Sequence, residues 1–449
     1  MRDSDCRRYG LSAHRDRLAV RPGRRGGRGR LAITAIAGAG CMLIAACSGS
    51  GSGPSSGSGQ AAPQVKASPA TPTADLSITP GNGGKNVNPS GGVTVTAKTG
   101  KIQSVTVTTG GSSVAGSLNA AGTVWHSTWA LHPSQSYTVT ATGLNSAGAK
   151  ATMTSSFSTL AAAQSDNPSI FEGLNQTYGV GMPIILQFAS PVTNKVAVES
   201  ALQLTTSKPV VGAWYWDGDQ TLYFRPQTYW PAGTQVSFVG HLNGVETSAG
   251  VYGTADLTQS FSIGPSLIAI ASTRTHYMQV YLNGKLYGNW PISTGMPGKD
   301  TANGTYVTIE KGNPTRMKGN GYNVLVADAV RFTYSGNYIH NAYWSVGQQG
   351  YTNVSHGCVN VSPYHAQLYY DMAVPGDPVT VKGSPAAGKW DDGWTVWFLT
   401  WSQLVSGSAL HEAVQTGPSG SSFVNPATLP AAAAATPLVS SQPNNALSQ

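Results

Sequence analysis

Short runs of alternating apolar and polar residues, separated by clusters of turn-forming residues, constrain the fold of this chain most strongly. The runs VTVTA (93–97), SVTVTT (104–109) and SYTVTATG (136–143) repeat every second residue, and PGNGG and NAAG lie between such runs. A period of two is that of a strand with one buried face, and glycine, proline and asparagine favour turns. Residues 76–160 are therefore predicted to form a β-sandwich.

A second block, residues 161–264, shows the same pattern. Its predicted strands are PIILQF (183–188), AWYWDG (213–218), TLYFRP (221–226) and TQVSFVG (234–240). Both blocks contain a proline between two strands, so we interpret them as tandem immunoglobulin-like modules. Their aromatic residues are expected in the cores. The predicted fold class is therefore mainly β.

A third β-rich block, residues 265–383, begins with a predicted hairpin around Asn283-Gly284, because Asn-Gly is a strong two-residue turn signal. Residues 312–323, GNPTRMKGNGYN, are predicted to form a loop. One short helix is expected within YHAQLYYDMAV, bracketed by Pro363 and Gly376.

The C-terminal region divides into a tryptophan-rich extension, residues 384–415, and a Ser-, Pro-, Ala- and Asn-rich tail, residues 416–449, predicted to be disordered. The tryptophan spacing in the extension favours one helix face, either a ligand-binding stripe or, as we prefer, a surface packed on the third block. The tryptophans in question are Trp390, Trp394, Trp397 and Trp401.

The N-terminal segment holds most of the net charge. Residues 1–30 carry ten arginines and three aspartates, or +7 of the formal +8, so the remainder is close to neutral and a nucleic-acid partner is not expected. An apolar run of 16 residues follows and ends in IAAC. Residues 1–47 are interpreted as a lipoprotein signal with Cys47 as the lipidated residue, and residues 48–75 as a flexible linker. A plain signal peptide or an uncleaved anchor is the alternative.

Of the four cysteines, Cys6 and Cys41 would leave with the signal and Cys47 would carry lipid. Cys358 is then the only free thiol of the mature chain and has no disulfide partner. An unpaired thiol in an oxidising compartment is either buried and inert or kept for its reactivity.

The sequence around Cys358 supports reactivity. A cysteine nucleophile needs a nearby base or a positive environment, and His356 and His340 are candidates. If His340 lies on a strand next to Cys358, it could face the thiol. Gly357 would allow close approach of a substrate, and the N–H groups of residues 357 and 358 are candidate oxyanion donors.

His340 followed by SHGCVN (355–360) resembles the signature of the L,D-transpeptidase (YkuD-type) catalytic domain. The resemblance extends over MQVYLNGKLYGNWPISTGMPGKDTANGTYVTIEKG and YSGNYIHNAYWSVGQQGYTNVSHGC. Two immunoglobulin-like modules, a catalytic block and a tryptophan-bearing extension resemble the actinobacterial lipoprotein members of that family.

The resemblance implies a cysteine transpeptidase of peptidoglycan. Cys358 would attack a tetrapeptide stem, release D-Ala and pass the acyl group to the side-chain amine of meso-diaminopimelate on another stem, giving a 3→3 cross-link. His340 would be the base, oriented by the backbone carbonyl of Asn341, and His356 would shape the site. No metal or cofactor is implied, and carbapenems are the expected inhibitors. Other implied contacts are the loop residues Ser355 and Asn360, the lid residue Tyr322 and the flanking Trp344.

The chain departs from the family pattern in two places. TANG (301–304) stands where a Thr-Pro-x-Gly turn is common, and Tyr343 stands where a proline is common. Neither is expected to touch the reacting groups.

Three other functions stay open from the residues. His340, His356, Cys358 and His365 could hold a structural zinc. The chain could also be a non-catalytic adhesin. The same acyl-enzyme could serve a carboxypeptidase or a ligase that attaches proteins to the wall. The expected location is the outer face of the cytoplasmic membrane.

Overall fold

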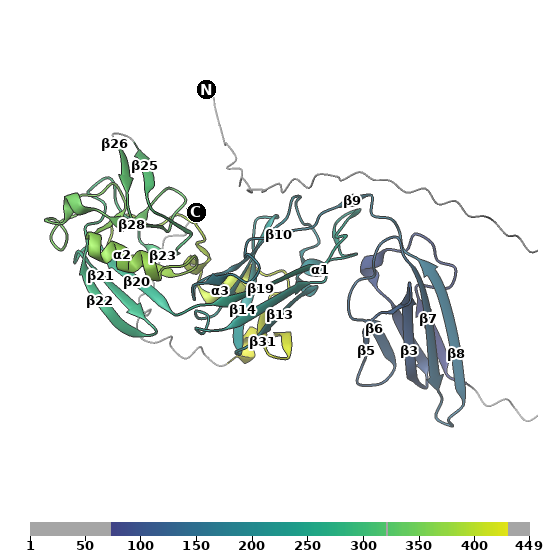
Figure 1. The fold of residues 1–449 in the computed structure, drawn as a ribbon. Helices are drawn as coiled ribbons and strands as arrows, with labels where there is room; N and C mark the ends of the chain where they lie inside the picture. The colour runs from purple at the N-terminus through teal and green to yellow at the C-terminus, as the bar shows by residue number, and fades with distance from the viewer. Residues whose placement is uncertain (1–72, 320–321, 430–449) are drawn as a thin grey trace, which may run out of the picture. The chain divides into compact units, whose positions relative to one another are not determined.

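The computed structural model describes residues 73–319 and 322–429 (Figure 1). This part of the chain is mainly β, which confirms the predicted fold class. The expected export signal, Cys47 and nearly all of the 48–75 linker lie outside the described residues. Within the described ranges, no helix is both long and apolar enough to cross a membrane.

The first sandwich consists of two four-stranded sheets, ordered β1-β2-β6-β5 and β4-β3-β7-β8. Its strands alternate as the sequence predicted: in β7, Tyr137, Val139 and Ala141 point into the core while their neighbours are exposed. The strands are β1 (Asp75–Thr79), β2 (Thr94–Thr99), β3 (Lys101–Thr109), β4 (Ser112–Ser113), β5 (Gly116–Leu118), β6 (Val124–Ser127), β7 (Ser136–Leu144) and β8 (Lys150–Ser158).

The second sandwich packs a six-stranded sheet, β10-β12-β15-β14-β31-β32, against the four-stranded sheet β11-β19-β16-β13. A small sheet, β17-β18-β9, and helix α1 (Lys195–Ser200) complete it. Its strands are β9 (Gln164–Ser165), β10 (Ser169–Ile170), β11 (Thr177–Tyr178), β12 (Ile184–Gln187), β13 (Leu202–Thr206), β14 (Val210–Asp217), β15 (Thr221–Pro226), β16 (Gln235–Gly240), β17 (Glu246–Ser248), β18 (Val251–Tyr252), β19 (Leu257–Ile263), β31 (Ala413–Gly417) and β32 (Gly420–Val424).

The third block contains a five-stranded sheet, β22-β21-β20-β30-β23, and a four-stranded sheet, β24-β27-β28-β29. Helix α2 (Pro363–Met372) begins after Ser362, whose side chain caps it, and its buried residues join the core of this block. The strands are β20 (Leu267–Ser272), β21 (Tyr277–Leu282), β22 (Lys285–Pro291), β23 (Gly304–Val307), β24 (Glu310–Gly312), β27 (Ala329–Arg331), β28 (Tyr338–Asn341), β29 (Val359–Val361) and β30 (Pro378–Lys382).

The segment predicted to be a loop is instead mostly a hairpin. Strands β25 (Thr315–Gly319) and β26 (Tyr322–Val326) pair antiparallel (Figure 1). Met317 of β25 and Val326 of β26 are buried in a small apolar cluster. The loop prediction was wrong because glycine and asparagine dominate the composition, while the pairing depends on a few apolar residues.

The tryptophan-rich extension is not one continuous helix. It contains a 3₁₀ turn, Val396–Phe398, and the short helix α3 (Trp401–Ser406), because Gly393 adopts a φ of 133° that interrupts any helix. The tryptophans pack mainly on the second sandwich rather than on the third block. Trp390 donates to Asp217 (3.1 Å), and Trp397 donates to the Gly181 carbonyl (2.6 Å).

The prediction of a disordered tail from residue 416 onward was wrong for its first residues. Residues 413–417 and 420–424 form β31 and β32, and β31 pairs with β14 of the second sandwich. This pairing joins segments far apart in the sequence, so local composition did not reveal it.

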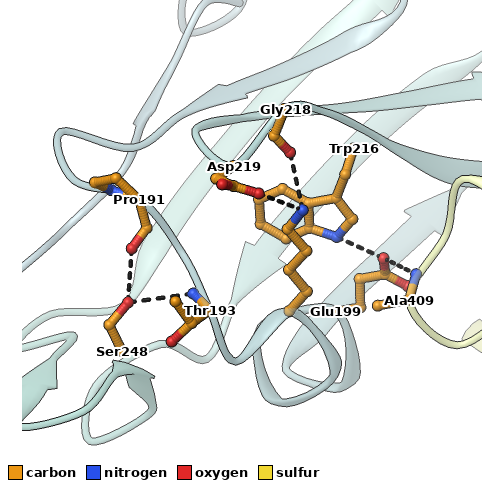
Figure 2. A network of polar contacts seen from close by, with 9 residues as sticks. Pro191, Thr193, Glu199, Trp216, Gly218, Asp219, Ser248 and Ala409 are labelled. Atoms are coloured by element: carbon orange, nitrogen blue, oxygen red, sulfur yellow. Dashed lines mark hydrogen bonds and ion pairs between the residues drawn. The ribbon is translucent and has the colours of Figure 1, made fainter.

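A buried carboxylate anchors the extension to the second sandwich (Figure 2). Glu199 of α1 is fully buried and accepts hydrogen bonds from Trp216 Nε1 (2.7 Å), Ser408 Oγ (2.7 Å) and the N–H of Ala409 (2.7 Å). These buried donors would be unpaired without Glu199. Its carboxylate therefore fixes the segment just before β31 to the second sandwich.

Candidate active site

Two adjacent parallel strands position the candidate histidine and cysteine. β28 pairs with β29, with His340 opposite Asn360, and Cys358 immediately precedes β29. Ile339 and Val359 are buried in the core of the block, which holds both strands in register. The sequence therefore brings the two reactive side chains to neighbouring positions on one sheet.

A cavity of about 260 Å³ lies over these strands. One wall comes from the β25–β26 hairpin and another from the loop that precedes β29. Its lining residues are Met317, Tyr322, Val324, His340, Trp344, Val354, Ser355, His356, Cys358 and Asn360.

His340 is 3% exposed and its tautomer follows from its neighbour. Its Nδ1 lies 2.8 Å from the backbone oxygen of Asn341, which can only accept a hydrogen bond. Nδ1 therefore carries the proton, and Nε2 is the unprotonated nitrogen of the neutral ring. Burial lowers the pKa of His340 to about 4, against the opposing effect of hydrogen bonds to Asn341 and Asn360.

Cys358 is half-buried, and burial raises the pKa of its thiol to about 11. The Sγ lies 3.7 Å from the carbonyl oxygen of Gly336, a distance that fits a weak S–H···O hydrogen bond. At neutral pH, thiol and imidazole are both uncharged. Attack by such a thiol requires that its proton leave as the bond to the substrate forms.

Hydrogen bonds fix the loop around the thiol. Ser355 Oγ donates to the Cys358 carbonyl (2.7 Å) and accepts from the Gly357 N–H (3.1 Å). Thr301 Oγ1 donates to the Gly357 carbonyl (2.8 Å). Because the Gly357 N–H is engaged, the N–H of Cys358 is the better candidate oxyanion donor of the two that the sequence indicated.

Aromatic rings frame the cavity. Tyr322 lies 4.9 Å from the His356 ring between centroids, and Trp344 lies 6.0 Å from the His340 ring. Trp344 is 46% exposed and Tyr343 beside it is 71% exposed. Tyr322 and Trp344 thus both line the cavity, each beside one of its two histidines.

The structure brings seven predicted residues to one cavity: Cys358, His340, His356, Tyr322, Trp344, Ser355 and Asn360. Gly357 lies beneath it in the buried loop, and Asn341 contributes its carbonyl. Cys47 lies outside the described residues.

Sequence reasoning missed Thr301 and Gly336. Thr301, the first residue of TANG, is 1% exposed and donates directly to the Gly357 carbonyl, so this segment supports the loop of the candidate nucleophile.

The zinc alternative finds no support in the residues that the structure describes. No group of three or more His, Cys, Asp or Glu side chains there is arranged to hold a metal ion. His365, one of the four proposed ligands, is instead stacked on Trp290, with 4.8 Å between the ring centroids.

Comparison with known proteins gives two family matches. Residues 266–381 match YkuD, the L,D-transpeptidase catalytic domain, and residues 84–246 match Big_10, a bacterial Ig domain. L,D-transpeptidase 2 of Mycobacterium tuberculosis is 34% identical over 417 residues, which span 87% of this chain and 98% of that protein. This chain belongs to the L,D-transpeptidase family.

A second relative supports the same family membership for this L,D-transpeptidase. L,D-transpeptidase 5 of Mycobacterium tuberculosis is 33% identical over 397 residues, covering 85% of each chain. A solved L,D-transpeptidase structure in complex with imipenem covers 48% of this chain and 97% of its own, at 34% identity and a TM-score of 0.41. Because the chain belongs to this family, as the catalytic-domain match and the two relatives show, it is an enzyme of the L,D-transpeptidase type, which argues against the adhesin alternative.

Proposed function

We propose that this L,D-transpeptidase forms 3→3 cross-links in peptidoglycan through an acyl-enzyme on Cys358. The single observation that carries the proposal is the shared cavity of Cys358 and His340, with the histidine proton fixed on Nδ1 by Asn341. The unprotonated Nε2 is then the base available to the thiol.

The first half-reaction acylates the enzyme. As Sγ of Cys358 attacks the carbonyl that precedes the terminal D-Ala, its proton passes to His340 Nε2. The oxyanion of the tetrahedral intermediate is stabilised by the N–H of Cys358. The intermediate collapses when the C–N bond breaks and His340 returns the proton to the departing D-Ala amine.

The second half-reaction transfers the acyl group. His340 takes a proton from the side-chain amine of a meso-diaminopimelate residue on a second stem. That amine attacks the thioester, the C–S bond breaks, and His340 returns the proton to the sulfur, so Cys358 leaves as a thiol. Apolar and aromatic walls from Met317, Tyr322 and Trp344 limit water, which would otherwise compete for the thioester and yield a carboxypeptidase.

Intact-protein mass spectrometry with a carbapenem tests the nucleophile. A β-lactam carbonyl is a strained acyl donor, and its ring opening leaves the whole inhibitor on the enzyme. Residues 48–449 should gain one inhibitor mass. Cys358→Ala should gain none, and His340→Gln should react at least about 100-fold more slowly, in line with loss of a general base.

The matched control is His356→Gln, a histidine in the same cavity that is exposed. Its acylation rate should fall far less than that of His340→Gln. An adduct that persists in Cys358→Ala, or none in a folded wild type, would refute the nucleophile assignment.

An assay with a tetrapeptide stem as the sole substrate distinguishes the reactions that the acyl-enzyme could undergo. Mass spectrometry should show release of D-Ala and a cross-linked dimer. A tripeptide without dimer would instead identify a carboxypeptidase. A protein amine added as competitor would reveal ligase activity as a protein–stem adduct.

We also propose that the protein is exported and anchored by lipid on Cys47, since enzymes of this family act on the cell wall. The arginine-rich segment and the IAAC sequence before the linker support this. Metabolic labelling with an alkyne fatty acid should mark the wild type and leave Cys47→Ala unlabelled. Labelling of both would place the lipid elsewhere.

A further inference from the structure

A tight turn, Thr333–Asn337, lies directly against the nucleophile loop. The Gly336 carbonyl accepts from the Cys358 thiol at 3.7 Å. The side-chain nitrogen of Asn337 lies only 2.6 Å from where a Cβ on Gly357 would be. Because of these two contacts, a shift of this turn would change the hydrogen bond of the Cys358 thiol and the packing of the loop that carries it.

The turn carries its own internal bonds. Thr333 Oγ1 donates to Asn337 Oδ1 (2.9 Å) and accepts from the Asn337 N–H (2.8 Å). Gly336 has a φ of 98°, which favours glycine at that position. These bonds shape the turn but do not attach its exposed tip to the rest of the molecule.

Arg331 of β27 donates to the carbonyls of Thr333 (2.8 Å) and Tyr334 (2.6 Å), and the C-terminal extension attaches the turn at Ser335. Asp392 accepts from the Ser335 N–H through Oδ1 (2.5 Å) and from Ser335 Oγ through Oδ2 (2.6 Å). Both bonds involve a charged acceptor, so they are stronger than bonds between neutral groups. Both carboxylate oxygens are thus used on a single residue of the turn.

Asp392 is itself held between two anchored tryptophans. Trp390 donates to Asp217 at the end of β14, and Trp394 is 4% exposed and packs edge-on against Phe171 at 4.5 Å. The support of the turn therefore reaches back to the second sandwich.

We infer that Asp392 is a positioning residue for Cys358, acting through Ser335 and the Thr333–Asn337 turn. This rests on the proposed function, in which Cys358 is the nucleophile. The role of the extension is then to fix the side chain of Cys358 and the backbone of Gly357 for attack, rather than to contact substrate.

Four variants test the inference in the full chain. Asp392→Ala removes both acceptors. Asp392→Asn keeps an acceptor for the Ser335 N–H and offers a donor to Ser335 Oγ, so it should rescue most of the effect. Ser335→Ala removes one of the two bonds at an exposed site. Asp391→Asn, at the exposed neighbour, is the control with the same change in charge.

The primary readout is the carbapenem acylation rate per titrated active site, which is unaffected by any unfolded fraction. Asp392→Ala should be acylated about tenfold more slowly and Ser335→Ala about threefold more slowly. For a tetrapeptide stem, kcat should fall while KM stays within twofold. Asp391→Asn should match the wild type.

The second readout is the pH profile of Cys358 alkylation by iodoacetamide. The bond to the Gly336 carbonyl favours the protonated thiol, so its loss in Asp392→Ala should shift the profile to lower pH. The other titratable groups around the thiol are His340, His356, Tyr322 and Tyr338, and all remain unchanged. A purely structural role would lower stability without this shift.

The outcomes separate the two proposals. If the wild type is not acylated, the proposed function fails. If the wild type is acylated and Asp392→Ala matches it in rate and pH profile, only the positioning role is overturned. Should Asp392→Ala not fold, Ser335→Ala decides: an unchanged rate and profile overturn the inference, and a slower rate with a shifted profile supports it.

Discussion

The backbone oxygen of Asn341 lies 2.8 Å from Nδ1 of His340, the residue directly before it. The orienting group in this pair is a peptide carbonyl rather than a carboxylate. It fixes the tautomer but brings no negative charge to stabilise an imidazolium. The buried histidine is accordingly neutral, and the site has the character of a general base rather than of a preformed ion pair.

Because His340 is neutral in the folded chain, the free energy of unfolding depends on pH. The pKa of His340 in the folded chain is about 4, below the ordinary value of 6.5, so its contribution is present above pH 6.5 and is lost as pH falls toward 4. The loss amounts to at most about 3 kcal/mol. Urea unfolding at pH 7.5 and pH 4.5 should show a smaller acid effect in His340→Gln than in the wild type.

Exposed His132 provides the control for that comparison. His132→Gln should keep the acid sensitivity of the wild type. Equal sensitivity of His340→Gln and wild type would mean that the buried imidazole does not govern acid unfolding.

Gly357→Ala should damage both the loop and the reaction. Gly357 has a φ of 121°, and an added Cβ would come within 2.6 Å of Asn337 Nδ2. We expect a loss of about 1–3 kcal/mol in unfolding free energy. The acylation rate should fall more than tenfold because Cys358 is the next residue.

Gly347→Ala is the matched control for Gly357→Ala, since a Cβ there meets no atom within 4 Å. Its stability and acylation rate should stay close to wild type. Thermal unfolding and stopped-flow acylation measure the two effects separately. A fully active Gly357→Ala would show that the loop can relax.

Glu199→Ala should loosen the C-terminal extension. The substitution leaves Trp216 Nε1 and the Ala409 N–H (Figure 2), and also Ser408 Oγ, without their buried acceptor. A cost of at least about 2 kcal/mol is expected. Hydrogen exchange should accelerate in β31 and β32, whereas Val196→Ala, at an exposed position of the same helix, should leave it unchanged.

Tyr322→Ala should weaken substrate binding at the hairpin edge of the cavity. Loss of the ring that lies 4.9 Å from His356 should cost about 1 kcal/mol, or roughly a fivefold increase in KM. Tyr322→Phe retains the ring and should behave like the wild type. Leu325→Ala, at an exposed position of the same strand, is the control, and an equal rise in KM there would point to general hairpin disorder.

Local signals explain which elements were predictable. Asn283 and Gly284 both adopt positive φ in the turn between β21 and β22, as their residue types favour, and Ser362 caps α2 as the proline after it indicated. The neighbourhood of His340 and Cys358 followed from a motif that lies on two strands of one sheet.

Non-local contacts explain the failures. The tryptophans are three or four residues apart, as on one face of a helix, yet the positive φ of Gly393 interrupts helical geometry between Trp390 and Trp394. Thr301 supports Gly357 from 56 residues away, and no pattern within either segment announces that bond. Such contacts exist only once the chain has folded.

The pairing of β31 with β14 has a consequence for biosynthesis. β31 follows β14 in the chain only after the whole catalytic block, so the second sandwich has an unpaired strand edge until the last strands have joined it. Premature termination after that block would leave the edge open to neighbouring chains.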